Sequence, residues 1–334
     1  MPIIYVNQVG GQDELVFDGG SVAIGSSGHV ACRVGAFDEG LYPVDVLFDD
    51  KSVKLHQGAL AAMPELEASV YQALVTGVRD YVNKNGFKGV VLGLSGGIDS
   101  ALTLAVAVDA LGAERVEAVM MPYHYTSGMS LEDAEAQANT QRVTYRVLPI
   151  APMVEAFMTT LEPVFAGLPR DTTEENLQAR CRGTLLMALS NKTGSLVLTT
   201  GNKSEMAVGY ATLYGDMAGG FDVLKDVPKT LVFRLAEYRN SIDPVIPQRV
   251  IDRPPSAELA PELDEILRLY IEHDQSASAI IAAGFAEDVV KRVLRLVDLN
   301  EYKRRQAAVG ARVTQRGFGR DRRYPITSGW ALDD

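Results

Sequence analysis

The run from residue 90 to residue 107 constrains the fold more than any other part of the sequence. Residues 90–94 are apolar and predict a buried β-strand, residues 95–97 read Ser-Gly-Gly, and the apolar stretch that follows predicts a helix beginning at Asp99. Glycines allow the backbone to approach an anion closely, and the N–H groups of such a turn and of the next helix N-terminus attract it. This strand-turn-helix unit therefore predicts a phosphate site in an α/β protein.

Polar side chains in the turn indicate which phosphate chemistry it serves. The hydroxyls of Ser95 and Ser100 can donate hydrogen bonds to phosphate oxygens, and the Asp99 carboxylate can hold Mg²⁺. No lysine follows the glycines, so the turn is not the Gly-x-x-x-x-Gly-Lys-Ser/Thr loop. An ordinary strand-to-helix turn with glycines for tight packing is the alternative. The pattern Ser-Gly-Gly-x-Asp-Ser resembles the pyrophosphate-binding loop of the N-type ATP pyrophosphatases, which split ATP between its α- and β-phosphates to adenylate a substrate.

The overall charge restricts the class of partner. The 334-residue chain has a formal net charge of −11 and is 47% hydrophobic, so it can bury a large core, and we expect no nucleic-acid or membrane partner. Two cysteines are too few for a disulfide framework or a zinc site, and the lack of a signal peptide or long apolar run predicts a cytoplasmic location. Residues 303–323 are instead rich in Lys and Arg, and predict either a solvated, interface-forming tail or a phosphate-facing segment.

Strands and helices alternate through most of the chain. Predicted strands lie at residues 89–94, 115–121, 143–150 and 195–200. Predicted helices lie at 66–86, from 99 onward, after a cap at Ser130 with Asp133, at 151–165, and at 172–189 after a second capping box opened by Thr172. The alternation predicts a Rossmann-like parallel sheet with helices on both faces, of the adenine nucleotide alpha hydrolase-like type. Ligands of such sheets bind beyond the carboxyl ends of the strands, where Ser95, Met121 and Thr200 lie.

Two further segments carry polar groups to that edge. Residues 200–202 offer a hydroxyl and bare backbone to a nucleotide, and Glu205 could share a metal with the carboxylate of the turn; a solvated acid at a helix start is the alternative. The glycine-rich segment 214–221 predicts a substrate lid or binding loop, with Asp216 and Lys229 gripping a polar substrate, and a mobile surface loop is the alternative.

The start of the long helix contributes one more candidate. Arg180, a turn beyond Asn176, could meet a carboxylate or a phosphate. Cys181 falls among the apolar positions of that helix, so we expect it to pack in the core rather than act as a nucleophile. The four histidines have neither metal-ligand nor triad spacing.

Residues 1–50 consist of short β-type runs separated by glycine pairs. Segments 5–13 and 17–21 resemble the last part of the nitrilase-like glutaminase domain, an α/β sandwich, of glutamine-dependent NAD⁺ synthetases. That domain works with a Cys, a Lys and a Glu, which the resemblance places upstream of this segment. Cys32 matches none of them and is expected to be structural, so we expect no complete glutaminase site in the chain. Residues 51–64 predict a linker.

The remaining segments together resemble the synthetase domain of the NAD⁺ synthetases over residues 65–334. The segments that carry this resemblance are 95–100, 172–182, 200–205, 214–221, 252–259, 301–306 and 320–325. The resemblance implies that ATP is bound by Ser95, Gly96, Gly97, Asp99, Ser100 and Thr200. It implies that Mg²⁺ is held by Asp99 and Glu205, and that the deamidated dinucleotide is held by Asn176, Arg180, Glu205, Asp216, Lys229 and Lys303. Asp216 and Lys229 would be catalytic, near the reacting carboxylate.

The implied reaction is an ATP-dependent amidation. Nicotinic acid adenine dinucleotide (deamido-NAD⁺) would be converted to NAD⁺ through an acyl-adenylate, with release of AMP and pyrophosphate. Ammonia would supply the nitrogen, from glutamine where a glutaminase domain is fused, and this chain by itself is expected to use ammonia. The resemblance also implies a homodimer or higher homo-oligomer.

Two other functions compete with this interpretation. One is a different ATP pyrophosphatase, such as a GMP-synthetase-like amidoligase or a tRNA-thiolating enzyme; the acidic charge and the lack of paired cysteines disfavour thiolation. The other is a non-catalytic nucleotide sensor, which would not need both Asp99 and Glu205. The sequence departs from the family at two places, a short linker after Asp50 and a short segment between Leu259 and the helix from Pro261, where a longer loop is usual.

Overall fold

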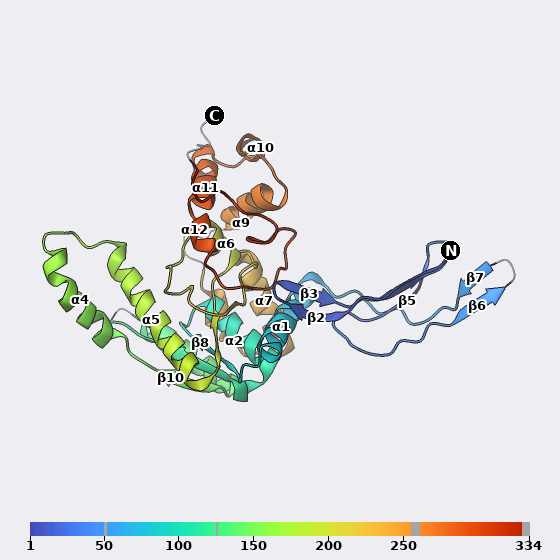
Figure 1. The fold of residues 1–334 in the computed structure, drawn as a ribbon, viewed down its shortest axis with the longest axis horizontal. Coiled ribbons are helices and arrows are strands. Elements are labelled where there is room, and N and C mark those ends of the chain that lie inside the picture. Colours follow the sequence, from blue (N-terminus) through green and yellow to red (C-terminus); the bar gives the residue numbers. More distant parts are fainter. Residues whose placement is uncertain (50–51, 125, 255–260, 329–334) are drawn as a thin grey trace.

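A five-stranded parallel sheet forms the centre of the molecule (Figure 1). The structure is a computed structural model that describes residues 1–49, 52–124, 126–254 and 261–328. The strands are β8 (Val90–Gly93), β9 (Val116–Met120), β10 (Thr144–Val147), β11 (Leu196–Thr199) and β12 (Phe221–Asp222). Their order is β10-β9-β8-β11-β12, and each neighbouring pair is parallel. The predicted Rossmann-like sheet is confirmed.

The strand order reverses next to the predicted phosphate turn. β8 is followed by α2 (Ile98–Leu111), η1 (Ala113–Arg115) and β9, which pairs with one edge of β8, whereas β11 pairs with its other edge. Open α/β sheets bind ligands in the crevice at such a reversal, because the two connections leave the sheet in opposite directions. Ser95 follows β8 and Thr200 follows β11, so both lie at this crevice.

The strands bury side chains on both faces because successive residues point to opposite sides. Leu92 packs in one core with α1 (Leu66–Lys84), α2 and α7 (Lys229–Ile242). Its neighbour Val91 packs in a second core with α4 (Ala151–Phe165) and α5 (Thr172–Thr193). Burial on both faces explains the continuous apolar runs of the sequence. Cys181 of α5 is buried in the second core, as predicted.

Two helix starts differ from the prediction. α3 (Gly128–Gln141) is capped by Ser127, whose Oγ accepts a hydrogen bond from the Ser130 N–H at 3.1 Å, so Ser130 itself lies inside the helix. α5 is capped by Asp171, which forms the capping box with Glu174. A cap is the residue whose oxygen reaches the free N–H groups of the first turn, and in both cases that residue precedes the predicted one.

A second group of helices forms a separate small core around the C-terminal part of the chain. Its helices are α6 (Lys203–Val208), α9 (Pro261–Leu267), the π-helix η3 (Arg268–Glu272), α10 (Ala277–Ala282), α11 (Glu287–Leu299) and α12 (Glu301–Arg304). α8 (Gln248–Asp252) follows α7 in the chain and contacts α2 and α7. Most of the 252–259 segment, from residue 255 onward, lies outside the described residues, as do residues 329–334 of the predicted domain.

The first sixty residues form an arm that extends away from the sheet (Figure 1). Its strands are β1 (Ile3–Tyr5), β4 (Val22–Ile24) and β5 (Val30–Arg33) in one antiparallel sheet, the hairpin β2 (Val9–Gln12) with β3 (Leu15–Asp18), and the hairpin β6 (Val46–Asp49) with β7 (Ser52–Leu55). The predicted linker from residue 51 therefore contains a strand. β2 fastens the arm to the body, because Gly11 N–H donates to Asp80 of α1 at 2.7 Å.

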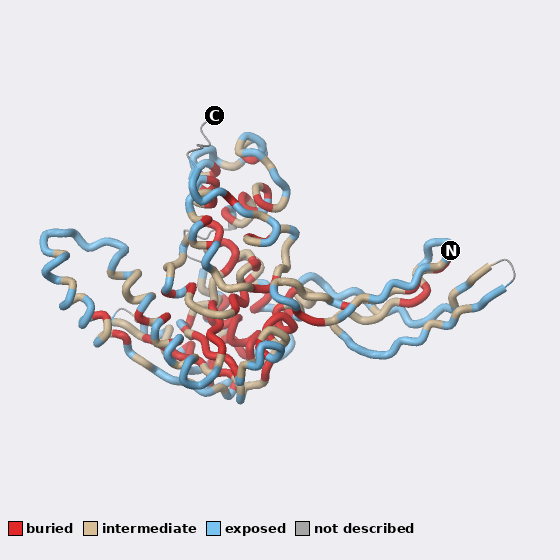
Figure 2. The backbone as a smooth tube through the Cα atoms, in the orientation of Figure 1, coloured by how far each residue is buried: buried red, intermediate tan, exposed pale blue. Residues whose placement is uncertain are grey.

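The sheet region and the arm differ in how deeply their residues are buried. Buried residues are concentrated around the sheet, while most of the arm is exposed or half-buried (Figure 2). Among the described residues, no helix combines the length and apolar character needed to cross a membrane.

Candidate active site

The phosphate loop is a closed ring of hydrogen bonds between β8 and α2. Ser100 Oγ donates to the Gly97 carbonyl at 3.0 Å and accepts from the Ser95 N–H at 3.1 Å. Ser95 Oγ lies 3.0 Å from Ser100 Oγ and accepts from the Gly97 N–H at 3.2 Å. Gly96 has a φ of +76°, and a Cβ there would lie 2.4 Å from the Ser130 carbonyl oxygen, so only glycine fits. The predicted strand-turn-helix unit is confirmed, and the close approach of Gly96 to Ser130 is the tight packing that the alternative expected of these glycines.

Two carboxylates meet next to this loop. Asp99 is the second residue of α2, and Glu205 lies in the first turn of α6. Asn202 joins them: its Nδ2 donates to Asp99 Oδ1 at 2.9 Å, while its backbone N–H donates to Glu205 Oε2 at 3.1 Å. The Lys229 ammonium, from the first turn of α7, forms an ion pair with the other oxygen of Asp99. Residues more than a hundred positions apart thus form one charged cluster.

The charge balance of this cluster suits a divalent cation. Burial, and then the charge of Asp99, raise the pKa of Glu205 to about 8, while Lys229 partly opposes the shift. A bound cation would lower that pKa by stabilising the carboxylate. The described residues contain no group of three His, Cys, Asp or Glu side chains arranged for a metal. Two carboxylates with further ligands from phosphates and water are a set that Mg²⁺ accepts.

Two adjoining cavities open around the cluster. The first, of about 210 Å³, is lined by Ser95, Asp99, Ser100, Thr200, Glu205 and Asp216 among others. The second, of about 350 Å³, shares Ser95, Thr200 and Asp216 with the first and continues between apolar side chains of the strand ends and α5. The polar cavity can take phosphates, and the more apolar one can take a flat ring system. Burial raises the pKa of Asp216, which borders both cavities.

Three of the predicted dinucleotide ligands contact one loop beside the cavities. Lys303 of α12 donates to the carbonyls of Gly209 and Ala211 at 2.7 and 2.8 Å. Asn176 Oδ1 accepts from the Thr212 hydroxyl at 2.8 Å, and Arg180 Nε donates to the Leu213 carbonyl at 3.2 Å. In this structure Asn176, Arg180 and Lys303 hold the segment 209–216, which we call the wall loop.

The sequence analysis missed one buried acid of the site. Asp222, at the end of β12, lines the polar cavity and is 3% exposed. Burial raises its pKa to about 7, and its Oδ1 has no hydrogen-bond partner among the described residues. In the sequence, Asp222 merely follows Gly-Gly-Phe, and this pattern does not indicate that its carboxylate is buried. Its burial depends on the pairing of β12 with β11, a contact that the sequence does not reveal.

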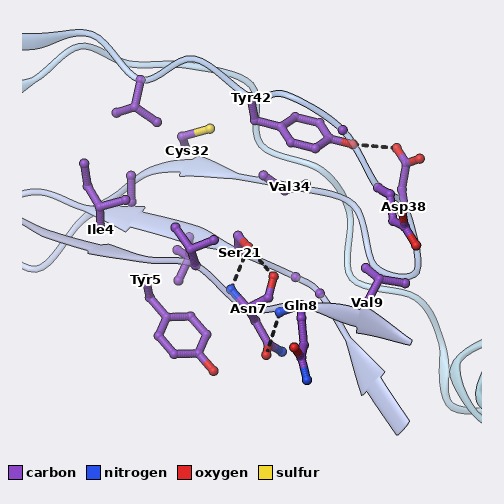
Figure 3. Close-up of a pocket in the computed structure, with 18 residues that line it drawn as sticks. Ile4, Tyr5, Asn7, Gln8, Val9, Ser21, Cys32, Val34, Asp38 and Tyr42 are labelled. Atoms are coloured by element: carbon purple, nitrogen blue, oxygen red, sulfur yellow. Dashed lines mark hydrogen bonds between the residues drawn. The ribbon is translucent and has the colours of Figure 1, made fainter. Parts of the chain in front are cut away.

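A larger cavity, of about 490 Å³, lies in the N-terminal arm, away from these charges (Figure 3). Ile4, Tyr5, Val34 and Cys32 supply much of its lining, and its carboxylate Asp38 accepts a hydrogen bond from the Tyr42 hydroxyl at 2.7 Å. The volume is greater, but the phosphate loop and the paired carboxylates lie elsewhere. We therefore place the candidate active site at the β8–β11 crevice. Cys32 is buried in β5, in keeping with the structural role predicted for it.

Comparison with known proteins identifies the relatives of this chain. The sequence model of the NAD synthase family matches residues 70–307. A glutamine-dependent NAD⁺ synthetase from Acinetobacter baylyi is 58% identical over 346 aligned positions, which cover 99% of this chain and 64% of the relative. The chain thus spans less than two thirds of that curated relative, and the same holds for others that it matches.

Solved structures agree with the sequence relatives. The glutamine-dependent NAD⁺ synthetase from Acinetobacter baumannii, solved in complex with ADP, is 57% identical with a TM-score of 0.74, and covers 100% of this chain and 63% of its own. The NH₃-dependent NAD synthetase from Campylobacter jejuni is 28% identical with a TM-score of 0.62, and covers 72% of this chain and 96% of its own. On the family match and on the phosphate loop, sheet and crevice described above, the chain belongs to the NAD synthase family.

Proposed function

We propose that this chain amidates deamido-NAD⁺ at the expense of ATP, through an acyl-adenylate. The observation that carries the proposal is the cluster of Asp99, Glu205 and Lys229 beside the phosphate loop, at the reversal of the strand order. Membership of the NAD synthase family and the ADP-bound relative support it. A module that only binds nucleotides would not need a buried pair of carboxylates whose charges repel each other.

In this proposal the ATP phosphates bind at the loop of residues 95–100, and the adenosine binds in the apolar cavity beside it. Ser95, whose hydroxyl accepts from the Gly97 N–H, and Thr200 both line the polar cavity in which the phosphates would bind. Asp99 and Glu205 would hold Mg²⁺, which when bound neutralises phosphate charge. Lys229 supplies a fixed cation close to the same phosphates.

The chemistry has two steps. The nicotinate carboxylate attacks the α-phosphorus, the bond between that phosphorus and the bridging oxygen breaks, and pyrophosphate leaves. Ammonia then attacks the acyl carbon, and AMP leaves with the electrons of the anhydride bond. The nitrogen loses a proton in this step, and Asp216, with its raised pKa, is the candidate acceptor.

The nitrogen source is a separate part of the proposal. The longer relatives are named glutamine-dependent, whereas the relative from C. jejuni, which aligns with 72% of this chain, is named NH₃-dependent. We propose that this chain uses free ammonia, and that glutamine serves only where a glutaminase domain is joined to it. The resemblance of residues 1–50 to the end of such a domain supports this division, and Cys32 is buried in β5.

A homo-oligomer is the remaining part of the proposal. α4 and α5 project from the sheet (Figure 1), and α4 exposes Phe157 and Val164, which are 51% and 70% accessible. A second copy of the chain covering these side chains would remove them from water. Light scattering of the purified chain tests this proposal, and a monomer at all accessible concentrations would contradict it.

Pyrophosphate release with Mg·ATP and deamido-NAD⁺ tests the central proposal. We expect turnover with ammonium and none with glutamine. Turnover with glutamine would contradict the assigned nitrogen source, and no pyrophosphate with either would contradict the assigned substrate. Asp99→Asn should keep the circular dichroism spectrum and lose most of the adenylation rate; full activity in that variant would remove Asp99 from the metal site.

A further inference from the structure

An arginine that lines neither cavity of the candidate site contacts a backbone carbonyl of the phosphate loop. Arg253 follows α8, and two nitrogens of its guanidinium reach different acceptors: the Gly96 carbonyl oxygen at 3.4 Å and Asp133 Oδ2 at 3.1 Å. We infer that Arg253 is a positioning residue that fixes the orientation of the Gly96–Gly97 peptide. The inference rests on the proposed function, since it takes the loop to be the site of the nucleotide phosphates.

The orientation of that peptide decides whether the loop attracts or repels phosphate. In a planar trans peptide the C=O and the N–H point in opposite directions. Because the Gly96 carbonyl accepts from Arg253, the Gly97 N–H points the other way and donates at 3.2 Å to Ser95 Oγ, the hydroxyl of a residue that lines both cavities. A rotated peptide would present a carbonyl oxygen to the phosphates instead. Because the peptide lies between two glycines, its rotation meets little steric resistance. A hydrogen bond from outside the loop would prevent that rotation.

A buried carboxylate holds Arg253 in place. Asp133 of α3 is 1% exposed, and its two oxygens accept from two arginines, Arg249 on one side and Arg253 on the other. The same helix forms the back wall of the loop, since a Cβ on Gly96 would meet the Ser130 carbonyl at 2.4 Å. Charge-assisted hydrogen bonds to a buried carboxylate are strong and directional. Arg253 therefore links α3 to the loop carbonyl, with the shorter of its two contacts on the buried aspartate.

Arg249 provides a matched control in the same cluster. Its side chain is 48% exposed and contacts the same aspartate as Arg253, whose side chain is 34% exposed. The other hydrogen bonds of Arg249 go to Glu132 and to the Met129 carbonyl, both on α3. Removing Arg249 weakens the hold on Asp133 while it leaves the contact with the loop carbonyl intact.

The test measures nucleotide affinity by calorimetry in the full chain, with Mg·ATP and with AMP. AMP lacks the β- and γ-phosphates that the loop is assigned to hold. We expect Arg253→Met to weaken ATP about tenfold, as for the loss of one charge-assisted hydrogen bond, and to leave AMP within about twofold. Arg253→Lys should recover part of the loss, and Arg249→Met should stay within about threefold of wild type.

Three results would overturn the inference. They are an unchanged ATP affinity in Arg253→Met, an equal loss for ATP and AMP, and a loss in Arg249→Met as large as that in Arg253→Met. In the last case the aspartate, not the loop carbonyl, carries the effect. The binding comparison needs no second substrate, so it stands even if wild-type chain releases no pyrophosphate with deamido-NAD⁺. Where turnover occurs, KM for ATP should rise and KM for deamido-NAD⁺ should stay unchanged.

Discussion

Replacing Asp222 by Asn should make the protein more stable, and increasingly so as the pH rises. The Asp222 carboxyl is buried at the end of β12, its pKa is raised by burial from 3.8 to about 7, and Oδ1 has no partner among the described residues. The folded state therefore binds a proton that the unfolded chain releases. Stability is lost as the pH rises from about 4 to about 7 and stays at the lower level above that.

The magnitude follows from the two pKa values. The difference between 3.8 and about 7 corresponds to about 4 kcal/mol in full, at 1.36 kcal/mol for each pH unit. Between about pH 5 and about pH 8 the wild-type protein should lose roughly 2–3 kcal/mol through this group alone. An Asn of the same shape does not titrate, so the stability advantage of the variant should grow by that amount. The charges of Glu14 and Asp226 still act on Lys225, the cation that opposes the pKa shift of Asp222, when the Asp222 charge is removed.

Urea unfolding followed by circular dichroism at the two pH values measures this difference. Asp45→Asn, at an exposed aspartate of the arm, is the control for a general change in charge. An advantage of Asp222→Asn that is the same at both pH values would refute the reasoning, because a pH-independent gain cannot come from a titrating carboxyl. A variant less stable than wild type at about pH 8 would refute it as well.

The other predictions concern the loop, a buried cation and the proposed catalytic role of Lys229. Gly96→Ala forces a Cβ to within 2.4 Å of the Ser130 carbonyl on a left-handed backbone, so ATP affinity by calorimetry should fall at least tenfold; wild-type affinity would contradict the tight fit. Lys203→Met leaves two buried carboxylates without their shared ammonium and should cost roughly 3–5 kcal/mol in urea unfolding, whereas a loss near zero would show that these carboxylates are solvated. Lys229→Met removes the cation beside Asp99, and pyrophosphate release should drop about a hundredfold with an unchanged circular dichroism spectrum; a wild-type rate would exclude Lys229 from catalysis.

The sheet could be predicted from the sequence because its signals are local. The run Val90 to Leu94 has no polar side chain, and its shortness and the Ser-Gly-Gly turn that follows favour a strand buried on both faces over a segment of buried helix. The exact helix starts could not be predicted in the same way, because more than one nearby residue can act as the cap. Ser127 and Ser130 are both good caps, and the choice depends on which hydroxyl reaches the other residue's N–H group, a matter of backbone geometry.

The paired carboxylates were predictable because both follow strand ends in a parallel sheet, and parallel strands bring those ends to one edge. Asp99 and Glu205 are far apart in sequence and still meet through Asn202. Asp222 and Arg253 were not predicted as site residues. The role of each depends on a neighbour from a distant segment: the cavity beside β11 for the first, and Asp133 with Gly96 for the second.

The wall loop is held by an unusual number of hydrogen bonds for its length. Gly209, Ala211, Thr212 and Leu213 are each tied to α5 or α12, and the Thr212 N–H in turn donates to Asp216 Oδ1 at 2.7 Å. Tyr214 follows with a φ of +63°, a costly backbone for a tyrosine, and its hydroxyl donates to the Gln306 side chain at 2.7 Å. These contacts hold residues 209–216 in one conformation, which favours a fixed binding loop over the mobile surface loop that was the alternative for the start of segment 214–221. If the dinucleotide binds here as proposed, the anchors Asn176, Arg180 and Lys303 would also affect it by fixing where the Asp216 carboxylate stands, so a loosened loop would cost affinity even where every direct contact with the ligand remained.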